Sequence, residues 1–426
     1  MLKQYDAQKG EEKQLFSALK SRAGSSTQEI AQKVRQVIED VQSEGDAALL
    51  RYCQQFDGVS PSSLALSQQE IDACLAKVSP ELFKTMQKAA ANIRSYHEKQ
   101  LCSSYEMEQN GRMLGRIVRP LRRVGVYVPG GTAAYPSTVL MNCIPAAVAG
   151  VEEIILVTPP KAEGVSPAVV AAAKIAGVRR IFTIGGAQAV AALAYGTRSI
   201  PAVDKIVGPG NVFVAEAKRQ VYGVVDIDMI AGPSEVLVLA DETANPRYVA
   251  ADLLSQLEHD ALSSAVLITT SKALAEATSA EIARQLCALT RREIMEKSLE
   301  DYSGAVLVSS MDQGFAIANA IAPEHLEILT ADPYADLKKV ENAGSIFLGE
   351  YSPEPLGDYF AGTNHVLPTN GTARFSSPLS VDDFIKKMSY LRYDRQALLE
   401  DAEDIIRLAK AEGLTAHANS VRIRQG

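Results

Sequence analysis

Short apolar runs alternate with helix-forming segments between residues 124 and 348 of this 426-residue chain. The runs that we expect to form strands are 124–128, 154–158, 181–184, 206–207, 235–239, 265–269, 305–308, 326–329 and 345–348. Strands that alternate with helices are typical of a parallel sheet wrapped by helices. Because the pattern repeats after a helix at 245–260, we predict two doubly wound α/β domains of comparable size.

The segments outside this pattern are mainly helical. We expect helices in most of the first hundred residues and two polar strands near 105–119. We therefore divide the chain into an N-terminal arm (1–22), a first α/β domain with the N-terminal helices (23–123 with 236–376), a second α/β domain (124–235) and a helical tail (377–426). The tail is rich in charge and has few core-forming residues, and such a tail usually packs on another body, often a partner subunit.

Composition argues against several classes of function. The net charge of −8 disfavours non-specific binding to nucleic acid or to a membrane surface. The five cysteines are scattered without a CxxC pair, which disfavours a thiolate metal site and a disulfide framework. No apolar stretch reaches the length of a membrane span, and the N-terminus has no apolar signal segment. We expect a cytoplasmic protein in a reducing compartment.

Four glycine-rich loops are expected at the carboxyl ends of strands, where ligands bind in open parallel sheets. They are Pro129-Gly130-Gly131, Gly185-Gly186-Ala187-Gln188, Gly208-Pro209-Gly210-Asn211 and Gly232-Pro233-Ser234-Glu235. Glycine lets a backbone approach a ligand closely, and a helix N-terminus favours phosphate, so the set suggests a nucleotide or dinucleotide crevice. The GxGxxG fingerprint is absent, and each loop could also be an ordinary tight turn.

The helix at 245–260 carries a candidate metal site. Asn245 can cap this helix, and Pro246 suits its first position. Gln256 and His259 are three residues apart on one face, where an amide oxygen and an imidazole could bind a borderline metal such as zinc. The alternative is a polar outer face that happens to contain a histidine.

The placement of the other histidines favours a site. The chain has five histidines, and four of them lie in polar or Gly/Pro-marked contexts of its second half, namely His259, His325, His365 and His417. Asp358 is in a loop and could supply the carboxylate of an N/O metal site, although a loop Asp is most often a turn former. Glu412 is similarly ambiguous. His97 is expected to be a solvated or capping residue of a helix.

Glu324 and His325 are candidates for proton transfer. Adjacent Glu and His side chains can divide this work, since one can activate water while the other takes a hydroxyl proton. Neighbours on a strand point to opposite faces, so both reach one site only if the backbone turns, as Pro323 makes plausible. The alternative is a helix C-terminus with an exposed acid and a histidine.

Eight separated motifs follow one another along the chain. They are RVGVYVPGG (123–131), GGAQAVAALAYGT (185–197), VDKIVGPGN (203–211), AGPSEVLV (231–238), LLSQLEH (253–259), APEHLE (322–327), GDYFAGTNHVLPT (357–369) and EGLTAHANSVRIR (412–424). In this order they resemble the histidinol dehydrogenase family, and the resemblance runs from about residue 25 to the end. It implies incomplete Rossmann-like domains, which would explain the missing fingerprint.

The resemblance also implies the roles of individual residues. One zinc ion per subunit would be bound by Gln256, His259, Asp358 and His417. The last of these would come from the neighbouring subunit of a homodimer. NAD contacts would come from Tyr127, Gln188 and Asn211. The catalytic pair would be Glu324 and His325. Substrate contacts would come from Ser234, Gln256, His259, His325, Asp358, His365, Glu412 and His417.

The implied activity is the last step of histidine biosynthesis, in which L-histidinol is oxidised to L-histidine through bound L-histidinaldehyde with two NAD. Zinc would hold the reactive intermediate in place between the two hydride transfers. We hypothesise that His325 accepts the hydroxyl proton in the first oxidation and that Glu324 activates water to hydrate the aldehyde. Three alternatives stay open: a zinc hydrolase, a related zinc dehydrogenase of another small hydroxy compound, and a non-catalytic ligand-binding protein.

Overall fold

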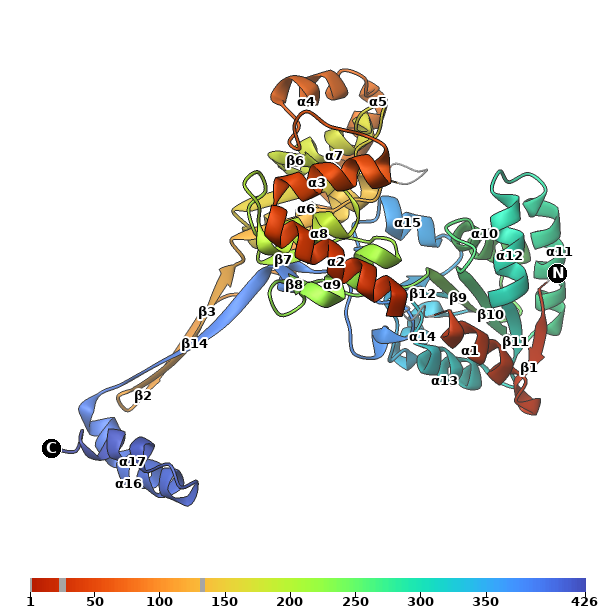
Figure 1. Ribbon diagram of the computed structural model, residues 1–426. Coiled ribbons are helices and arrows are strands. Elements are labelled where there is room, and N and C mark those ends of the chain that lie inside the picture. Colours follow the sequence, from red (N-terminus) through yellow and green to blue (C-terminus); the bar gives the residue numbers. More distant parts are fainter. Residues whose placement is uncertain (1, 23–27, 131–134) are drawn as a thin grey trace. The chain divides into compact units, whose positions relative to one another are not determined.

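The computed structural model describes residues 2–22, 28–130 and 135–426 and forms two compact units (Figure 1). The first unit comprises Met1–Gln100 with Leu121–Phe384, and the second comprises Leu101–Pro120 with Ile385–Gly426. The predicted α/β class is confirmed, because the first unit contains two fully parallel sheets with helices on their faces. Gly131, the last residue of the first predicted loop, lies outside the described residues.

The larger sheet of the first unit, called sheet A here, has six parallel strands in the order β1-β11-β10-β9-β12-β13. These strands are β1 (Gln4–Asp6), β9 (Glu235–Ala240), β10 (Ser264–Thr269), β11 (Gly304–Leu307), β12 (His325–Leu329) and β13 (Ser345–Leu348). Alternate side chains of β9 face opposite sides, so Val236 and Val238 enter one core and Leu237 and Leu239 the other.

Helices cover both faces of sheet A. The core that contains Val236 and Val238 includes α10 (Pro246–Leu257), α11 (Lys272–Leu286) and α12 (Arg292–Tyr302). The core that contains Leu237 and Leu239 includes α1 (Glu12–Ser21) and α13 (Met311–Ile321). Two short helices follow in the chain, α14 (Pro333–Asp336) and α15 (Glu354–Tyr359).

The smaller sheet, called sheet B here, has five parallel strands in the order β6-β5-β4-β7-β8. They are β4 (Arg123–Tyr127), β5 (Glu153–Thr158), β6 (Arg180–Thr183), β7 (Lys205–Val207) and β8 (Asp226–Ile227). The helices that follow its strands are α6 (Pro136–Ala149), α7 (Pro167–Ala176), α8 (Gly186–Tyr195) and α9 (Val212–Val221). Apart from β8, each strand of this sheet begins and ends within one residue of its prediction.

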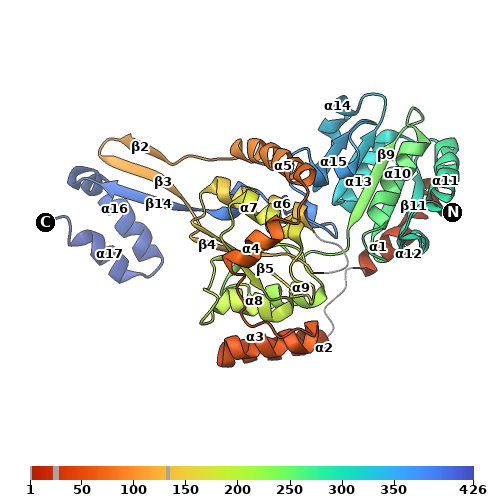
Figure 2. The same ribbon diagram turned by 90° about the horizontal axis from the view of Figure 1, so that it is seen from above.

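The described N-terminal helices pack on the helices of sheet B, whereas we predicted that residues 23–123 belong with residues 236–376. These helices are α2 (Gln28–Glu44), α3 (Asp46–Tyr52), α4 (Gln68–Leu75) and α5 (Pro80–Glu98). The apolar stripe of α2 contacts α8 and α9, and α5 contacts α6 (Figure 2). Periodicity identifies the buried face of a helix but not the sheet that covers it.

The second unit contains an antiparallel sheet with the strand order β14-β3-β2. Its elements are β2 (Tyr105–Gln109), β3 (Arg112–Pro120), β14 (Ile385–Tyr393), α16 (Arg395–Ala411) and α17 (Thr415–Arg422). The two predicted strands near 105–119 are confirmed. The predicted helical tail is confirmed by α16 and α17, but β14 was missed, and this strand pairs along its length with β3, more than 250 residues earlier in the chain.

The N-terminal arm belongs to sheet A. Its predicted helix is confirmed as α1, but β1 was missed, and this strand of three residues pairs with β11 at one edge of the sheet. Among the residues that the structure describes, no helix is long and apolar enough to cross a membrane.

Candidate functional site

A cavity of about 720 Å³ in the first unit gathers most of the predicted site residues. From sheet A, it is lined by Ser234, next to the first residue of β9, and by Glu324 and His325 at the start of β12. From sheet B, it is lined by Pro129 and Asn211, which follow β4 and β7. The loop at 232–235 follows β8 in the chain and leads directly into the amino end of β9.

Glu324 and His325 are both anchored to the main chain of Glu235. The carboxylate Oε2 of Glu324 accepts a hydrogen bond of 2.8 Å from the Glu235 N–H. The Nδ1 atom of His325 is 2.9 Å from the Glu235 carbonyl oxygen. Because a carbonyl can only accept, Nδ1 carries a proton here and Nε2 can face a reacting group. The Nε2 atom is buried and has no hydrogen-bond partner in the described chain.

The predicted turn before β12 explains how adjacent residues reach one site. Helix α13 ends at Ala322, which has a positive φ of 53°, and Pro323 follows it. His325 pairs with Val236 in the sheet, so Glu324 lies beside Glu235, just before the regular strand. Because Glu324 precedes the regular strand, its side chain need not point to the face opposite that of His325. The side chains of Glu324 and His325 therefore both contact the main chain of Glu235.

Burial and neighbouring charges shift the pKa values of both Glu324 and His325. Burial is the main cause that raises the pKa of Glu324. For His325, burial lowers the pKa, but the carboxylates of Glu324 and Asp358 outweigh it and the net shift is upward. His325 Nδ1 is 3.6 Å from Glu324 Oε2, and its Nε2 is 3.7 Å from Asp358 Oδ1. Such groups, with perturbed pKa values in a cavity, are typical of acid–base chemistry.

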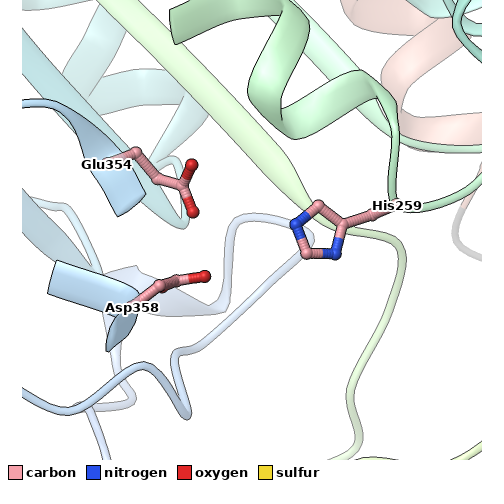
Figure 3. A group of neighbouring side chains, drawn as sticks. All are labelled: His259, Glu354 and Asp358. Carbon is pink, nitrogen blue, oxygen red and sulfur yellow. The ribbon is translucent and has the colours of Figure 1, made fainter. Parts of the chain in front are cut away.

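Nitrogen and oxygen donors converge next to this pair. One ligand atom each from His259, Glu354 and Asp358 lies within 4.8 Å of the others, and Figure 3 shows both carboxylates directed toward the imidazole. Helix α10 begins after Asn245, which is confirmed as its N-cap. Gln256 lies at the other end, in the last turn of the helix. Both amide atoms of Gln256 are buried without a hydrogen-bond partner in the described chain. An N/O donor set of this kind fits zinc.

Glu354 was missed by our reading of the sequence. Its side chain is only 2% exposed and accepts a hydrogen bond of 3.0 Å from the Ser255 hydroxyl. Burial and then the neighbouring Asp358 carboxylate raise the pKa of Glu354 to about 8. The available signal was its spacing, because Glu354 precedes Asp358 by four residues and shares its face of α15.

Two further predicted residues border the same cavity. His365 is half-buried, and its Nδ1 lies 3.1 Å from the Asp358 carbonyl oxygen, which leaves Nε2 available. Ser234 lines the cavity beside the anchor residue Glu235. Both positions can reach a small polar molecule that occupies the space in front of His325.

His97 is not solvated, so the first of its two expected roles, solvated or capping, is wrong. Its side chain is fully buried, its Nδ1 lies 2.8 Å from the Ile93 carbonyl oxygen, and its Nε2 lies 3.3 Å from the Asn364 amide nitrogen. Asn364 immediately precedes His365, so this contact joins α5 to the loop that presents His365.

The three predicted NAD residues differ in their positions. Asn211 lines the cavity, and its Oδ1 caps α9 by accepting from Phe213 and Val214. Tyr127 and Gln188 are buried and do not line the cavity. The Tyr127 hydroxyl accepts a 3.1 Å hydrogen bond from the Gly186 N–H. The Oε1 atom of Gln188 is buried without a partner in the described chain.

Glu412 and His417 lie in the second unit, and each is exposed there. Glu412 forms the C-cap of α16, and His417 lies within the first turn of α17.

Comparison with known proteins points to one family. A family model for histidinol dehydrogenase matches residues 20–425. The histidinol dehydrogenase of Lactococcus lactis is 52% identical and covers 100% of this chain and 99% of that protein. That of Clostridium acetobutylicum is 54% identical and covers 96% of this chain and 95% of that protein. The crystal structure of histidinol dehydrogenase from Elizabethkingia anophelis matches with a TM-score of 0.94 and 39% identity, over 99% of this chain and 98% of that one.

Proposed function

The chain belongs to the histidinol dehydrogenase family, as its motifs predicted, and on this premise we propose that it oxidises L-histidinol to L-histidine, the final step of histidine biosynthesis. The observation that carries the proposal is the pairing of two features in one cavity. Glu324 and His325, anchored on Glu235, lie beside the donor atoms of His259 and Asp358.

We propose that Gln256, His259 and Asp358 hold a zinc ion. The unpartnered amide of Gln256 supports this assignment, because a buried amide without a hydrogen bond is costly unless a ligand satisfies it. The fourth ligand in the proposal is His417 of the partner subunit. Zinc, when bound, supplies a positive charge that holds the nitrogen atoms of the amino alcohol.

His325 is the proposed base of the first oxidation. Its Nε2 accepts the proton of the substrate hydroxyl while the carbinol carbon loses a hydride, and the product is the bound aldehyde. NAD serves as the acceptor of one hydride in each oxidation. The Nδ1–H bond to Glu235 fixes the tautomer that leaves Nε2 free for this task.

Glu324 is the proposed base of the second stage. Its carboxylate takes a proton from water as the water oxygen bonds to the aldehyde carbon, which gives the hydrate. The hydrate then loses a second hydride and a proton and becomes the carboxylic acid. Ser234 and His365 are further proposed substrate contacts, and Glu412 is the contact proposed from the C-terminal tail of the neighbouring subunit.

The NAD side of the site is proposed at the carboxyl ends of the strands of sheet B. Asn211 already borders the cavity and is the direct contact that we expect. A contact from Tyr127 or Gln188 requires the loop at 185–188 to open, because both side chains are buried against it.

The second unit is the proposed source of the dimer contacts. Its residues, all of which the structure describes, include the strongly exposed apolar side chains of Leu391, Leu408 and Ile423. None of its residues takes part in the main core clusters of the described chain. A small unit with exposed apolar side chains and little core fits packing against a second copy.

The five free cysteines support the expected cytoplasmic location.

The test is the yield of NADH per L-histidinol consumed by the purified protein, before and after chelation. Two NADH per substrate, lost on chelation and restored by zinc, are the expected result. One NADH would show that the aldehyde escapes and that the second stage is wrong. No NADH from folded, zinc-loaded protein would overturn the proposal and favour another hydroxy compound or a hydrolase.

A further inference from the structure

Arg22 is a buried cation at the end of the N-terminal arm. It is the C-cap residue of α1, and its side chain is 1% exposed. Two of its guanidinium nitrogens donate to the carbonyl oxygens of Leu19 and Leu262, at 3.3 and 2.9 Å. The remaining nitrogen pairs with Glu235 Oε1 at 2.7 Å. The guanidinium also lies 5.7 Å from the ring centroid of Tyr302. Arg22 is thus held by several elements at once.

Glu235 connects this cation to the catalytic pair. Its side chain binds Arg22, whereas its main-chain N–H and carbonyl bind Glu324 and His325. Three neighbouring groups of a single residue therefore fix a buried arginine and both residues assigned to proton transfer. A rotation of Glu235 would move both hydrogen-bond partners of the catalytic pair together.

We propose that Arg22 and the Glu235 side chain are positioning residues for Glu324 and His325. The kinetic part of this proposal rests on the proposed function. The ion pair fixes the orientation of the Glu235 main chain, and through it the direction of Glu324 Oε2 and the tautomer of His325. Arg22 itself is not assigned a contact with substrate.

Stability alone is a weak reason for this arrangement. Two buried charges lose hydration, and an apolar pair of similar volume often serves the fold as well or better. Arginine, in contrast, presents several donors in a rigid fork, and here the fork meets two carbonyls and one carboxylate in fixed directions. Fixed geometry is what a catalytic pair requires, since displacement by about 1 Å can cost about 100-fold in rate.

The test compares three variants with a matched control. Arg22→Met and Glu235→Gln each break the ion pair, and the double variant Arg22→Met with Glu235→Leu replaces it by an apolar pair without an unpaired charge. The control is Lys205→Met, which removes another buried cation, paired with Asp226 and Asp383 at the amino end of β7. Thermal unfolding and zinc content are measured for every variant.

For the apolar double variant, we expect near-normal unfolding and zinc content, kcat lower by about 10- to 100-fold, and little change in the KM for L-histidinol. The Lys205→Met control is expected to lose stability but to keep kcat at temperatures where it is folded. Normal kcat in the folded double variant would overturn the proposal. An equal loss of kcat in the control would also overturn it, because the effect would then follow from any lost buried cation.

A measurement without substrate separates this proposal from the proposed function. The chain has five histidines, so ¹⁵N labelling of their rings gives few signals, and His325→Asn identifies that of His325. With the ring neutral, the expected His325 signal is that of a single Nδ1–H tautomer in the unmodified chain and of a tautomer mixture in the double variant. An unchanged signal would overturn the positioning role, even if no NADH formed from histidinol and the proposed function had failed.

Discussion

Sheets A and B have the same strand order, but sheet B lines the cavity at the carboxyl ends of its strands and sheet A at the amino ends. Relative to their order in the chain, β9 to β13 in sheet A and β4 to β8 in sheet B both follow the sequence third, second, first, fourth, fifth. Sheet B lines the cavity with residues after β4 and β7, such as Asn211. Sheet A lines it with residues at the amino ends of β9 and β12, such as Ser234 and His325.

The difference separates two tasks. The carboxyl ends of parallel strands are followed by loops and helix N-termini that suit a nucleotide, and sheet B keeps that use. In sheet A, β10 and β12 are preceded by the C-termini of α10 and α13, and there the chain places Gln256 at the end of α10 and Glu324 just after α13. We therefore expect changes on sheet A to affect turnover and changes on sheet B to affect the KM for NAD.

The largest effect is expected at the metal site on the sheet A side. His259→Ala should lower turnover by about 1000-fold, because loss of a ligand removes several kcal/mol of charge stabilisation and positioning. Steady-state rates and zinc content by atomic absorption measure it. Glu258→Gln, a change in the exposed neighbour, is the control. Zinc retained at full occupancy with normal turnover would remove His259 from the ligand set.

Glu324→Gln is expected to lower the second oxidation by about 100-fold and the first by much less. The glutamine can still occupy the position beside the Glu235 N–H but cannot take a proton from water. Single-turnover formation of NADH from histidinol, compared with that from added histidinaldehyde, resolves the two stages. Equal losses in both would show that Glu324 and His325 do not divide the work.

The variant Glu354→Gln tests whether the Glu354 carboxylate supports metal binding on the sheet A side of the cavity. Residues that support a metal ligand typically change metal affinity by about 10- to 100-fold when altered, and we expect a loss in this range. Competition with a chelator of known affinity measures it without turnover. Ser255→Ala, which removes only the hydroxyl donor to Glu354, should give a smaller loss. Unchanged affinity in Glu354→Gln would leave this carboxylate outside the site.

The smallest effect is expected on sheet B, at Asn211. Asn211→Ala loses both the cap of α9 and the amide, and should cost about 1 kcal/mol in the free energy of unfolding. Asn211→Ser keeps a capping oxygen and isolates the amide, so it should raise the KM for NAD with little change in kcat or stability. Denaturant unfolding and NAD titration of the rate measure both. A change in kcat alone would contradict the division between the sheets.

Local signals predicted much of this architecture. The strands of both sheets are continuous apolar runs, which is how strands buried on two faces look in a sequence, and most were predicted within one residue. Short polar strands such as β1 and β8 lack that signal. The pairing of β14 with β3 was also missed. Both strands are largely exposed and far apart in the chain, so no alternation of apolar residues indicates that they pair.

The candidate site was predictable where its residues lie close together in the chain. Gln256 with His259 and Glu324 with His325 are such pairs, and the structure brings them to one cavity. The link between Arg22 and Glu235 joins residues 213 positions apart, and no spacing rule reveals it. The burial of Tyr127 and Gln188 could not be predicted from the sequence either, because a side chain next to a glycine-rich loop can face the core as readily as a ligand.

The N-terminal arm has a practical consequence for protein production. A recombinant chain shortened to begin at Gln28 would retain Gln256, His259 and Asp358 and both proposed bases. It would lack the edge strand β1 and the guanidinium of Arg22. Such a protein would also lose the core contacts of α1, including Leu15. If Arg22 acts as proposed, the fraction that still folds and loads zinc would work slowly, so metal content would be a misleading measure of its quality.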